Sequence, residues 1–257
     1  MARNRVLLSG NTDWAGYVAG FHADRAGVTE DLLECAHDAG GLTPYDWAAN
    51  AVPPGLTVLD LACGSAPMHA RLRTARYVGV DLSPAELQKA AARGVPVATG
   101  DASRLPVPDA SVDAVVVSMA LMLVPLPNTL AEVARVLRPG GVLVATVPSG
   151  RPLPILDWLR YARLCLALRH WGLAYPNDRL LSDAGAAFRT AGLSLSSDDT
   201  RAFGCALTTP AVAERLLDSL YLPGVDPDRI AAGRRVARRW VGTTIAVPIR
   251  RMVAAKA

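Results

Sequence analysis

The 257-residue sequence lacks the features that mark several large classes of protein. No uncharged apolar run approaches the length of about 18 residues that a membrane-spanning helix needs. The basic N-terminus, residues 1–5, is followed by only a short apolar run, residues 6–8, which is too short for the core of a signal peptide. These absences favour a cytoplasmic protein with no membrane span.

Metal centres and disulfide frameworks are also not indicated. The four histidines are scattered, and none has metal-ligand spacing to another, so no metal is expected. None of the four cysteines is in a C-x-x-C pair, so free thiols are expected. These cysteines are Cys35, Cys63, Cys165 and Cys205.

What the sequence does contain is a large apolar fraction and one strongly patterned stretch, Thr57 to Asp81. Hydrophobic residues make up 51% of the chain, which is enough for a sizeable core. Val58 to Leu61 is an apolar run typical of a strand buried on both faces of a parallel sheet, and Tyr77 to Val80 is a second one. Ligands of open α/β sheets bind outside the carboxyl ends of the strands, so a ligand site is expected there.

The turn between these two strands indicates which kind of ligand binds. It contains one glycine, Gly64, and Pro67 is placed where a helix would begin. A dinucleotide site would instead show the spacing G-x-G-x-x-G, with glycines that admit a pyrophosphate. Asp60 also brings a negative charge next to the turn, which suits a cation better than a phosphate.

Four motifs in this region resemble those of one enzyme family. The stretch from Val58 to Gly64 resembles the first motif of the class I S-adenosylmethionine-dependent methyltransferases, and the stretch from Gly79 to Ser83 resembles their ribose-binding motif. Asp101-Ala102 resembles their adenine-binding pair, and the Leu-Arg-Pro-Gly-Gly turn at residues 137–141 is also typical of them. The resemblance, to the small-molecule UbiE-like branch, covers about residues 58–147.

This resemblance implies an architecture. We expect a Rossmann-like α/β fold with a seven-stranded, mostly parallel sheet and helices on both faces. A single domain over residues 1–257 is expected, with a helical lid at 11–50 and a cofactor-binding core at 57–147. Two cap insertions, at 152–180 and 210–241, are expected to roof the substrate pocket.

The resemblance also implies S-adenosyl-L-methionine as the cofactor. Asp81 is expected to bind the ribose hydroxyls, and Asp101 with the backbone of Ala102 is expected to bind the adenine. The full set of expected cofactor-binding residues is Asp60, Ala62, Cys63, Gly64, Asp81, Leu82, Asp101, Ala102, Ser118 and Met119.

Aromatic residues outside the motifs are candidates for the rest of the site. Trp14, Tyr17 and Phe21 recur at helical spacing, and they either pack a helix onto the body or form a lid over the cofactor. The catalytic candidates are Tyr17, Phe21 and His22. The candidates for the substrate pocket are Trp14, Met122, Trp158, Tyr161 and Tyr175, each of which could instead be part of the core.

A basic stripe lies near the C-terminus, at Arg234, Arg235, Arg238 and Arg239. Such a stripe is usually a solvated helix face, and contact with nucleic acid or anionic lipid is the alternative. Nucleic acid is not favoured, because no RNA-binding motif or interleaved aromatic residue accompanies the stripe. The oligomeric state cannot be predicted from the sequence.

The predicted function is methyl transfer to a small molecule, of the kind found in bacterial secondary metabolism. The apolar stretch Met119 to Val124 offers no proton acceptor, so the rate is expected to come from positioning and desolvation. Ala66-Pro67 departs from the family pattern and leaves open a second reaction, cyclisation of the cofactor to azetidine-2-carboxylate and methylthioadenosine. A non-catalytic cofactor-binding module is the third alternative.

Overall fold

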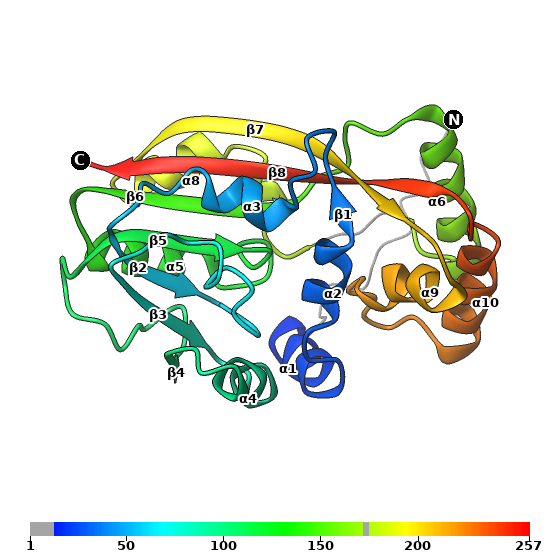
Figure 1. The fold of residues 1–257 in the computed structure, drawn as a ribbon, viewed down its shortest axis with the longest axis horizontal. Helices are drawn as coiled ribbons and strands as arrows, with labels where there is room; N and C mark the ends of the chain where they lie inside the picture. The colour runs from blue at the N-terminus through cyan, green and yellow to red at the C-terminus, as the bar shows by residue number, and fades with distance from the viewer. Residues whose placement is uncertain (1–12, 172–174) are drawn as a thin grey trace.

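A computed structural model describes residues 13–171 and 175–257. The basic N-terminus and the first two residues of the expected lid therefore lie outside the described residues. The centre of the molecule is one eight-stranded sheet with the order β1-β7-β8-β6-β5-β2-β3-β4 (Figure 1). The strands are β1 (Ala36–His37), β2 (Thr57–Leu61), β3 (Arg76–Asp81), β4 (Val97–Thr99), β5 (Val112–Ser118), β6 (Leu137–Pro148), β7 (Leu193–Ala206) and β8 (Thr244–Lys256).

The expected α/β fold is confirmed, with one strand more than the seven predicted. Strands β2 to β6 run parallel to one another, whereas β8 is antiparallel to both β6 and β7. The additional strand is β1, whose two residues pair with β7 at the far edge (Ala36 with Cys205). A strand this short carries no periodicity that a sequence pattern could reveal.

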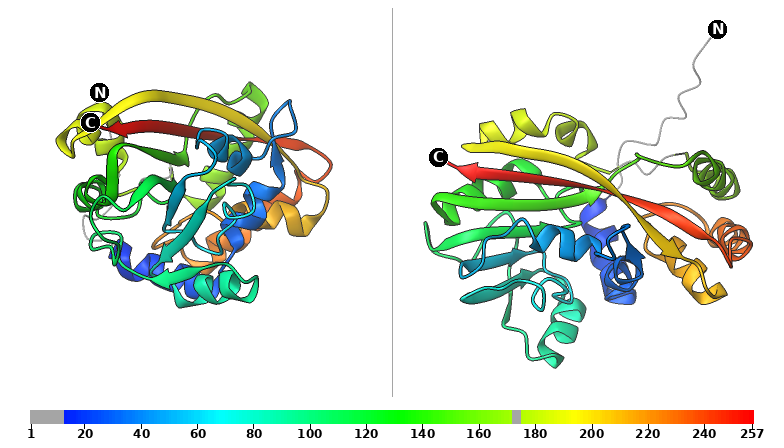
Figure 2. Two further views of the ribbon diagram at one scale, coloured as in Figure 1. Left: turned by 60° about the vertical axis from the view of Figure 1, so that its left-hand side comes forward. Right: turned by 45° about the horizontal axis from the view of Figure 1, so that its top comes forward.

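Helices cover both faces of the sheet (Figures 1 and 2). Successive strand residues point to opposite faces, so Val58 belongs to one buried cluster and Leu59 to the other. The cluster around Leu59 includes Phe188, and the cluster around Val58 includes Trp47. The helices are α1 (Trp14–Asp24), α2 (Val28–Glu34), α3 (Pro44–Ala49), α4 (Pro84–Ala92), α5 (Leu126–Val136), α6 (Ile155–Leu168), α7 (Asp178–Leu181), α8 (Ala184–Thr190), α9 (Pro210–Asp218) and α10 (Pro227–Arg238).

The helix predicted to begin at Pro67 does not form. Residues 67–71 make turns, and the backbone N–H of Leu72 bonds to the carbonyl of Met68 at 3.1 Å. The chain must return along the length of β2, which spans about 16 Å at roughly 3.3 Å per residue. A helix over the nine residues 67–75 would cover only about 13 Å and leave no residues for a loop. The return to β3 is therefore too short for a helical crossover.

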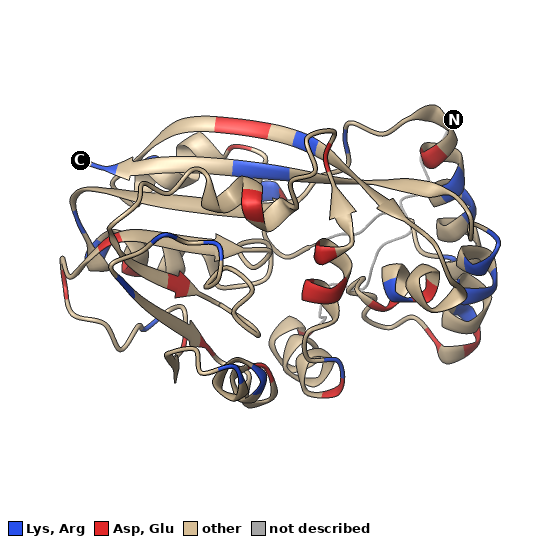
Figure 3. Ribbon diagram, in the orientation of Figure 1, with Lys and Arg blue, Asp and Glu red and all other residues tan. Residues whose placement is uncertain are grey.

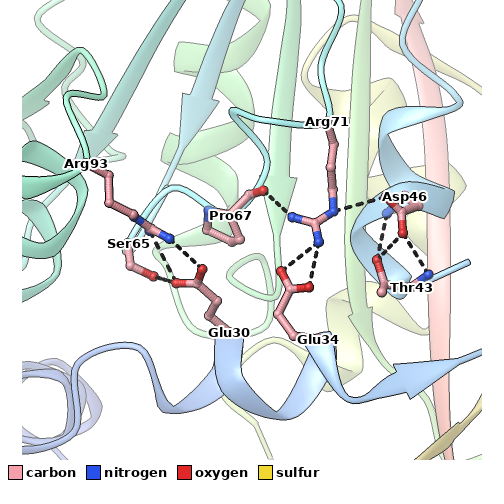
Figure 4. A network of polar contacts seen from close by, with 8 residues as sticks. All are labelled: Glu30, Glu34, Thr43, Asp46, Ser65, Pro67, Arg71 and Arg93. Carbon is pink, nitrogen blue, oxygen red and sulfur yellow. Dashed lines mark hydrogen bonds and ion pairs between the residues drawn. The ribbon is translucent and has the colours of Figure 1, made fainter.

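This turn is stabilised by the side chain of Arg71 and not by the hydrogen bonds of a helix (Figure 4). Its guanidinium donates to the Pro67 carbonyl at 2.7 Å, to Asp46 of α3 at 3.0 Å and to both carboxylate oxygens of Glu34 of α2 at 2.6 and 2.7 Å. Asp46 is itself fixed, because it closes a capping box with Thr43 at the start of α3. Helices α2 and α3 are thus fastened to the turn that follows β2.

Within the described ranges, no helix combines the length and the apolar character that crossing a bilayer requires.

Candidate functional site

A cavity of about 470 Å³ lies at the carboxyl ends of β2, β3 and β5, under α1. The strand order reverses at β2, whose neighbours β3 and β5 lead to opposite edges of the sheet. Such a switch point is where open α/β sheets bind their ligands. All ten residues expected to bind the cofactor line this cavity: Asp60, Ala62, Cys63, Gly64, Asp81, Leu82, Asp101, Ala102, Ser118 and Met119.

Asp81 joins the first two motifs. Its carboxylate accepts from the backbone N–H of Gly64 at 2.8 Å and from that of Ser83, also at 2.8 Å. Burial raises the pKa of Asp81 above its ordinary value, against the effect of these two hydrogen bonds. Each oxygen retains a lone pair for a ligand hydroxyl, because a carboxylate can accept about four hydrogen bonds.

The turn after β2 has an unusual backbone. Ala62, Gly64 and Ala66 all adopt left-handed conformations, with φ of 53°, 54° and 61°. Non-glycine residues seldom do so, and such strain concentrates at functional sites. Ser65, between them, donates a hydrogen bond to the carboxylate of Glu30 of α2, and Arg93 pairs with the same carboxylate at 2.8 Å (Figure 4). The strained turn is therefore held from outside by α2 and by the end of α4.

Asp60 lies beneath this turn and is almost completely buried, with 1% of its surface exposed. The Tyr77 hydroxyl donates to it at 2.6 Å. Burial raises the pKa of Asp60 to about 7, and the nearby Asp81 carboxylate adds to the effect. Asp60 therefore changes charge near neutral pH.

The cavity is acidic. Five carboxylates line it, Glu30, Asp60, Asp81, Glu86 and Asp101, and none of its described lining residues is a lysine or an arginine. A concave site lined by one sign of charge raises the local concentration of the opposite sign, so the cavity favours cations. Elsewhere in the described chain, as here, no group of three or more His, Cys, Asp or Glu side chains is arranged to hold a metal ion.

A series of hydrogen-bonded side chains connects Glu86 of α4 to Tyr221, which follows α9. Glu86, with 4% of its surface exposed, accepts from the backbone N–H of Gly27 at 3.0 and 3.1 Å. It also lies 2.8 Å from Nδ1 of His22, whose Nε2 lies 3.0 Å from the Tyr221 hydroxyl. With Glu86 accepting from Nδ1–H, the free lone pair is on Nε2 and accepts from Tyr221. His22, Glu86 and Tyr221 all line the cavity.

Comparison with known proteins identifies the domain. Residues 59–145 match the family model described as a methyltransferase domain. The demethylmenaquinone methyltransferase of Mycolicibacterium paratuberculosis is 45% identical over 100 residues, which cover 38% of this chain and 44% of the relative. The chain thus spans less than half the length of that relative.

Solved structures share the fold at low sequence identity. A geranyl diphosphate methyltransferase superposes with a TM-score of 0.53 at 17% identity, over 96% of this chain and 99% of the other. The cyclase SpnF superposes with a TM-score of 0.53 at 22% identity, over 82% of this chain and 79% of the other. Residues 59–145 therefore match a methyltransferase domain, and the chain shares its fold with these solved structures.

The cofactor of this methyltransferase domain is S-adenosyl-L-methionine, and the cavity suits it. S-adenosyl-L-methionine carries a positively charged sulfonium and a positively charged amino group. The five carboxylates of the cavity, which contains no lysine or arginine among its described lining residues, suit these two positive charges. The Leu82 side chain is 65% exposed at the cavity wall and offers an apolar surface to a base. Asp101 accepts from the backbone and the hydroxyl of Ser103, which lowers its pKa and keeps it an acceptor.

Two of the three catalytic candidates, Tyr17 and Phe21, do not line the cavity. The Tyr17 hydroxyl accepts from the backbone N–H of Leu222 at 2.7 Å, and Phe21 is buried against Tyr221, with ring centroids 4.5 Å apart. They lie on the inner side of α1 and contact the body of the molecule instead of the cavity. His22 is the one of the three that faces the cavity.

The expected substrate pocket is corrected in the same way. Of its five residues only Trp14 lines the cavity. Met122 is a core residue with 1% exposure, and Trp158 is 56% exposed on α6. Tyr161 donates to the Ala246 carbonyl at 3.0 Å, and Tyr175 packs behind Trp14 with ring centroids 6.3 Å apart.

The second expected cap reaches the cavity only through Tyr221, and the described part of the first does not reach it. Glu30, Glu86 and Tyr221 also line the cavity, although no sequence motif marks them as site residues. Glu86 is the third residue after the N-cap Ser83 of α4. An acidic residue is common at this position for helix capping, so its presence in the sequence does not indicate a site. Nothing in the sequence distinguished Tyr221, because it comes from the loop after α9, far along the chain.

Proposed function

We propose that this chain transfers a methyl group from S-adenosyl-L-methionine to a small molecule that is uncharged or cationic and largely apolar. The acidic cavity carries the proposal, since its five carboxylates favour the cationic donor and repel an anionic acceptor. The cavity wall beyond these carboxylates is apolar, with Trp14, Val18, Leu123 and Val124 among its residues.

Named residues would hold the donor. Asp81 would accept from the ribose hydroxyls, Asp101 and the backbone of Ala102 would bind the adenine, and Leu82 would cover its face. Glu30, held by Ser65 and Arg93, would face the amino group. When bound, the cofactor supplies an electrophilic methyl group on a positively charged sulfur.

The chain of Glu86, His22 and Tyr221 provides the proton acceptor that the apolar stretch after β5 lacks. Glu86 fixes the His22 tautomer through Nδ1, which leaves Nε2 able to take a proton from Tyr221 or directly from an acceptor molecule. Burial raises the pKa of Tyr221, so Tyr221 serves as a hydroxyl relay and not as a base.

The first experiment separates methyl transfer from cyclisation of the cofactor. The protein is incubated with S-adenosyl-L-methionine alone and then with acceptors, and products are followed by mass spectrometry. The test panel contains a demethylmenaquinone, since the matched relatives are named for it, and an acceptor bearing a carboxylate or phosphate. S-adenosylhomocysteine formed only with the uncharged acceptor supports the proposal, whereas methylthioadenosine formed without any acceptor contradicts it.

The second experiment tests His22. His22→Ala should lower kcat by about a hundredfold or more, because that is the usual contribution of a general base. Tyr221→Phe should lower it less, and Glu86→Gln should shift the pH profile of kcat/KM. S-adenosylhomocysteine binding, measured by calorimetry, serves as the control for the cofactor site. If kcat of His22→Ala is within threefold of the parent value, His22 is not a general base, and the rate comes from positioning and desolvation.

A further inference from the structure

Helix α6 (Ile155–Leu168) presents a fixed outer face. Its inner face contributes the buried residues Asp157, Leu164 and Leu168. The Asp157 carboxylate accepts from the backbone N–H of Ala246 at 2.9 Å, and the Tyr161 hydroxyl donates to the carbonyl of the same residue at 3.0 Å. These contacts tie α6 to β8 and determine which side of the helix faces outward.

The outer face is apolar. Ile155, Leu159 and Leu166 are 72%, 44% and 64% exposed, and their spacing of four and seven residues places them in one stripe. Trp158 lies beside the stripe with 56% exposure, and Trp171 lies just beyond the helix with 68% exposure. Among the described residues, none covers this outer apolar stripe, whereas the inner face of α6 is buried.

Exposed arginines lie on α6 and on the neighbouring helix α10. Arg163 and Arg169 are exposed at α6, whose one acid, Asp157, is buried and paired with Arg160 at 2.6 Å. Helix α10 lies against α6, since a side chain at Gly233 would meet Leu164 and Leu168. It adds the exposed residues Arg235 and Arg239, while Arg234 and Arg238 pair with acids of α9. Figure 3 shows blue segments, which mark Lys and Arg, on α6 and α10 at one end of the molecule.

We infer that the outer stripe of α6 docks on an anionic lipid surface. Exposed leucine, isoleucine and tryptophan on one face with arginine at its edges is the composition of a helix that lies in a membrane interface. A second copy of this chain fits the surface less well, because a symmetric contact would bring the same arginines together. The inference does not depend on the proposed methyl transfer, and its test needs no methyl acceptor.

The test measures binding of the full chain to vesicles. Flotation is carried out with neutral phosphatidylcholine vesicles and with vesicles that contain phosphatidylglycerol in addition. We expect binding to the anionic vesicles that weakens as salt is added. Leu166→Ser should reduce the partition coefficient roughly tenfold or more through lost apolar burial. Arg163→Gln and Arg169→Gln should each reduce it about fivefold, which corresponds to ~1 kcal/mol per charge near the surface.

Matched controls use similar residues elsewhere. Leu180→Ser changes an exposed leucine of α7, and Arg73→Gln changes an exposed arginine of the loop between β2 and β3. Both should bind vesicles as the parent does. The inference is overturned if the parent does not bind anionic vesicles, or if the controls lose binding equally. It is also overturned if Leu166→Ser dissociates an oligomer in light scattering while vesicle binding is unchanged, since the stripe would then be a contact between copies.

Discussion

At the scale of single residues, Asp81 links cofactor recognition to the turn that shapes the site. Its carboxylate holds the backbone of Gly64 and Ser83 and faces the cavity. Asp81→Ala should leave a folded protein that binds S-adenosylhomocysteine at least tenfold more weakly, because it removes the ribose acceptor and frees Gly64. Calorimetry measures the affinity, and unchanged affinity would refute the assignment of this site.

Asp101→Ala is the companion to that variant. The exposed Leu82 surface and the backbone of Ala102 remain when the Asp101 carboxylate is removed. Binding should therefore weaken less than in Asp81→Ala. The opposite order would mean that the adenine end dominates recognition.

At the scale of elements, the contacts of Arg71 replace a helix. It holds the turn after β2 against α2 and α3 through Glu34, Asp46 and the Pro67 carbonyl. Arg71→Ala should lower the free energy of unfolding by about 1–3 kcal/mol, as expected for charge-assisted hydrogen bonds. Urea denaturation measures this value, and Arg73→Ala, an exposed neighbour, should change it by less than about 0.5 kcal/mol.

Helix α1 is the element we predict to respond to the cofactor. It forms the cavity wall through Trp14, Val18 and His22, and it is joined to α4 by the contact between His22 and Glu86. A bound ligand adds contacts to this wall, so local opening should become rarer. Tryptic cleavage after the exposed Arg25 should slow when S-adenosylhomocysteine is added.

Cleavage after Arg163 on α6 is the internal reference for that experiment, because α6 does not line the cavity. Equal slowing at both arginines would indicate global stabilisation by the ligand. Equal cleavage after Arg25 with and without ligand would show that α1 does not close.

At the scale of the whole molecule, stability depends on pH through Asp60. Its pKa is about 7 in the folded chain and about 4 when unfolded, so between these values the unfolded chain loses its proton first. The contribution of Asp60 to the free energy of unfolding should therefore fall as pH rises from about 4 to 7. Asp60→Asn removes this titration, so the stability of the variant relative to the parent should increase between pH 5 and pH 8.

Urea denaturation at the two pH values measures that change. Asp228→Asn, at an exposed position of α10, should show a difference from the parent that is nearly the same at both. The pH dependence is the test, because the buried amide itself can raise or lower stability at every pH. A difference for Asp60→Asn that does not change with pH would contradict the raised pKa.

Local sequence patterns were sufficient to predict the fold class and ten residues that line the cavity. Val58 to Leu61 and Tyr77 to Val80 are apolar enough to be predicted as buried strands. The motif residues follow such strands, and the carboxyl ends of parallel strands meet at one edge of the sheet. All ten expected cofactor-binding residues therefore line the cavity.

The packing of distant elements selects which flanking residues join them at the cavity. Trp14, Tyr17 and Trp158 are equivalent in the sequence, since each is an aromatic residue on a predicted helix. In the structure, Trp14 lines the cavity, whereas Tyr17, on another side of α1, bonds to the backbone of Leu222. Trp158 is exposed to solvent because the contact of Asp157 with β8 fixes the orientation of α6. Tyr221 reaches His22 across 199 positions of the chain. Such contacts depend on how elements pack, and packing follows from the combined burial of the whole chain and not from any local pattern.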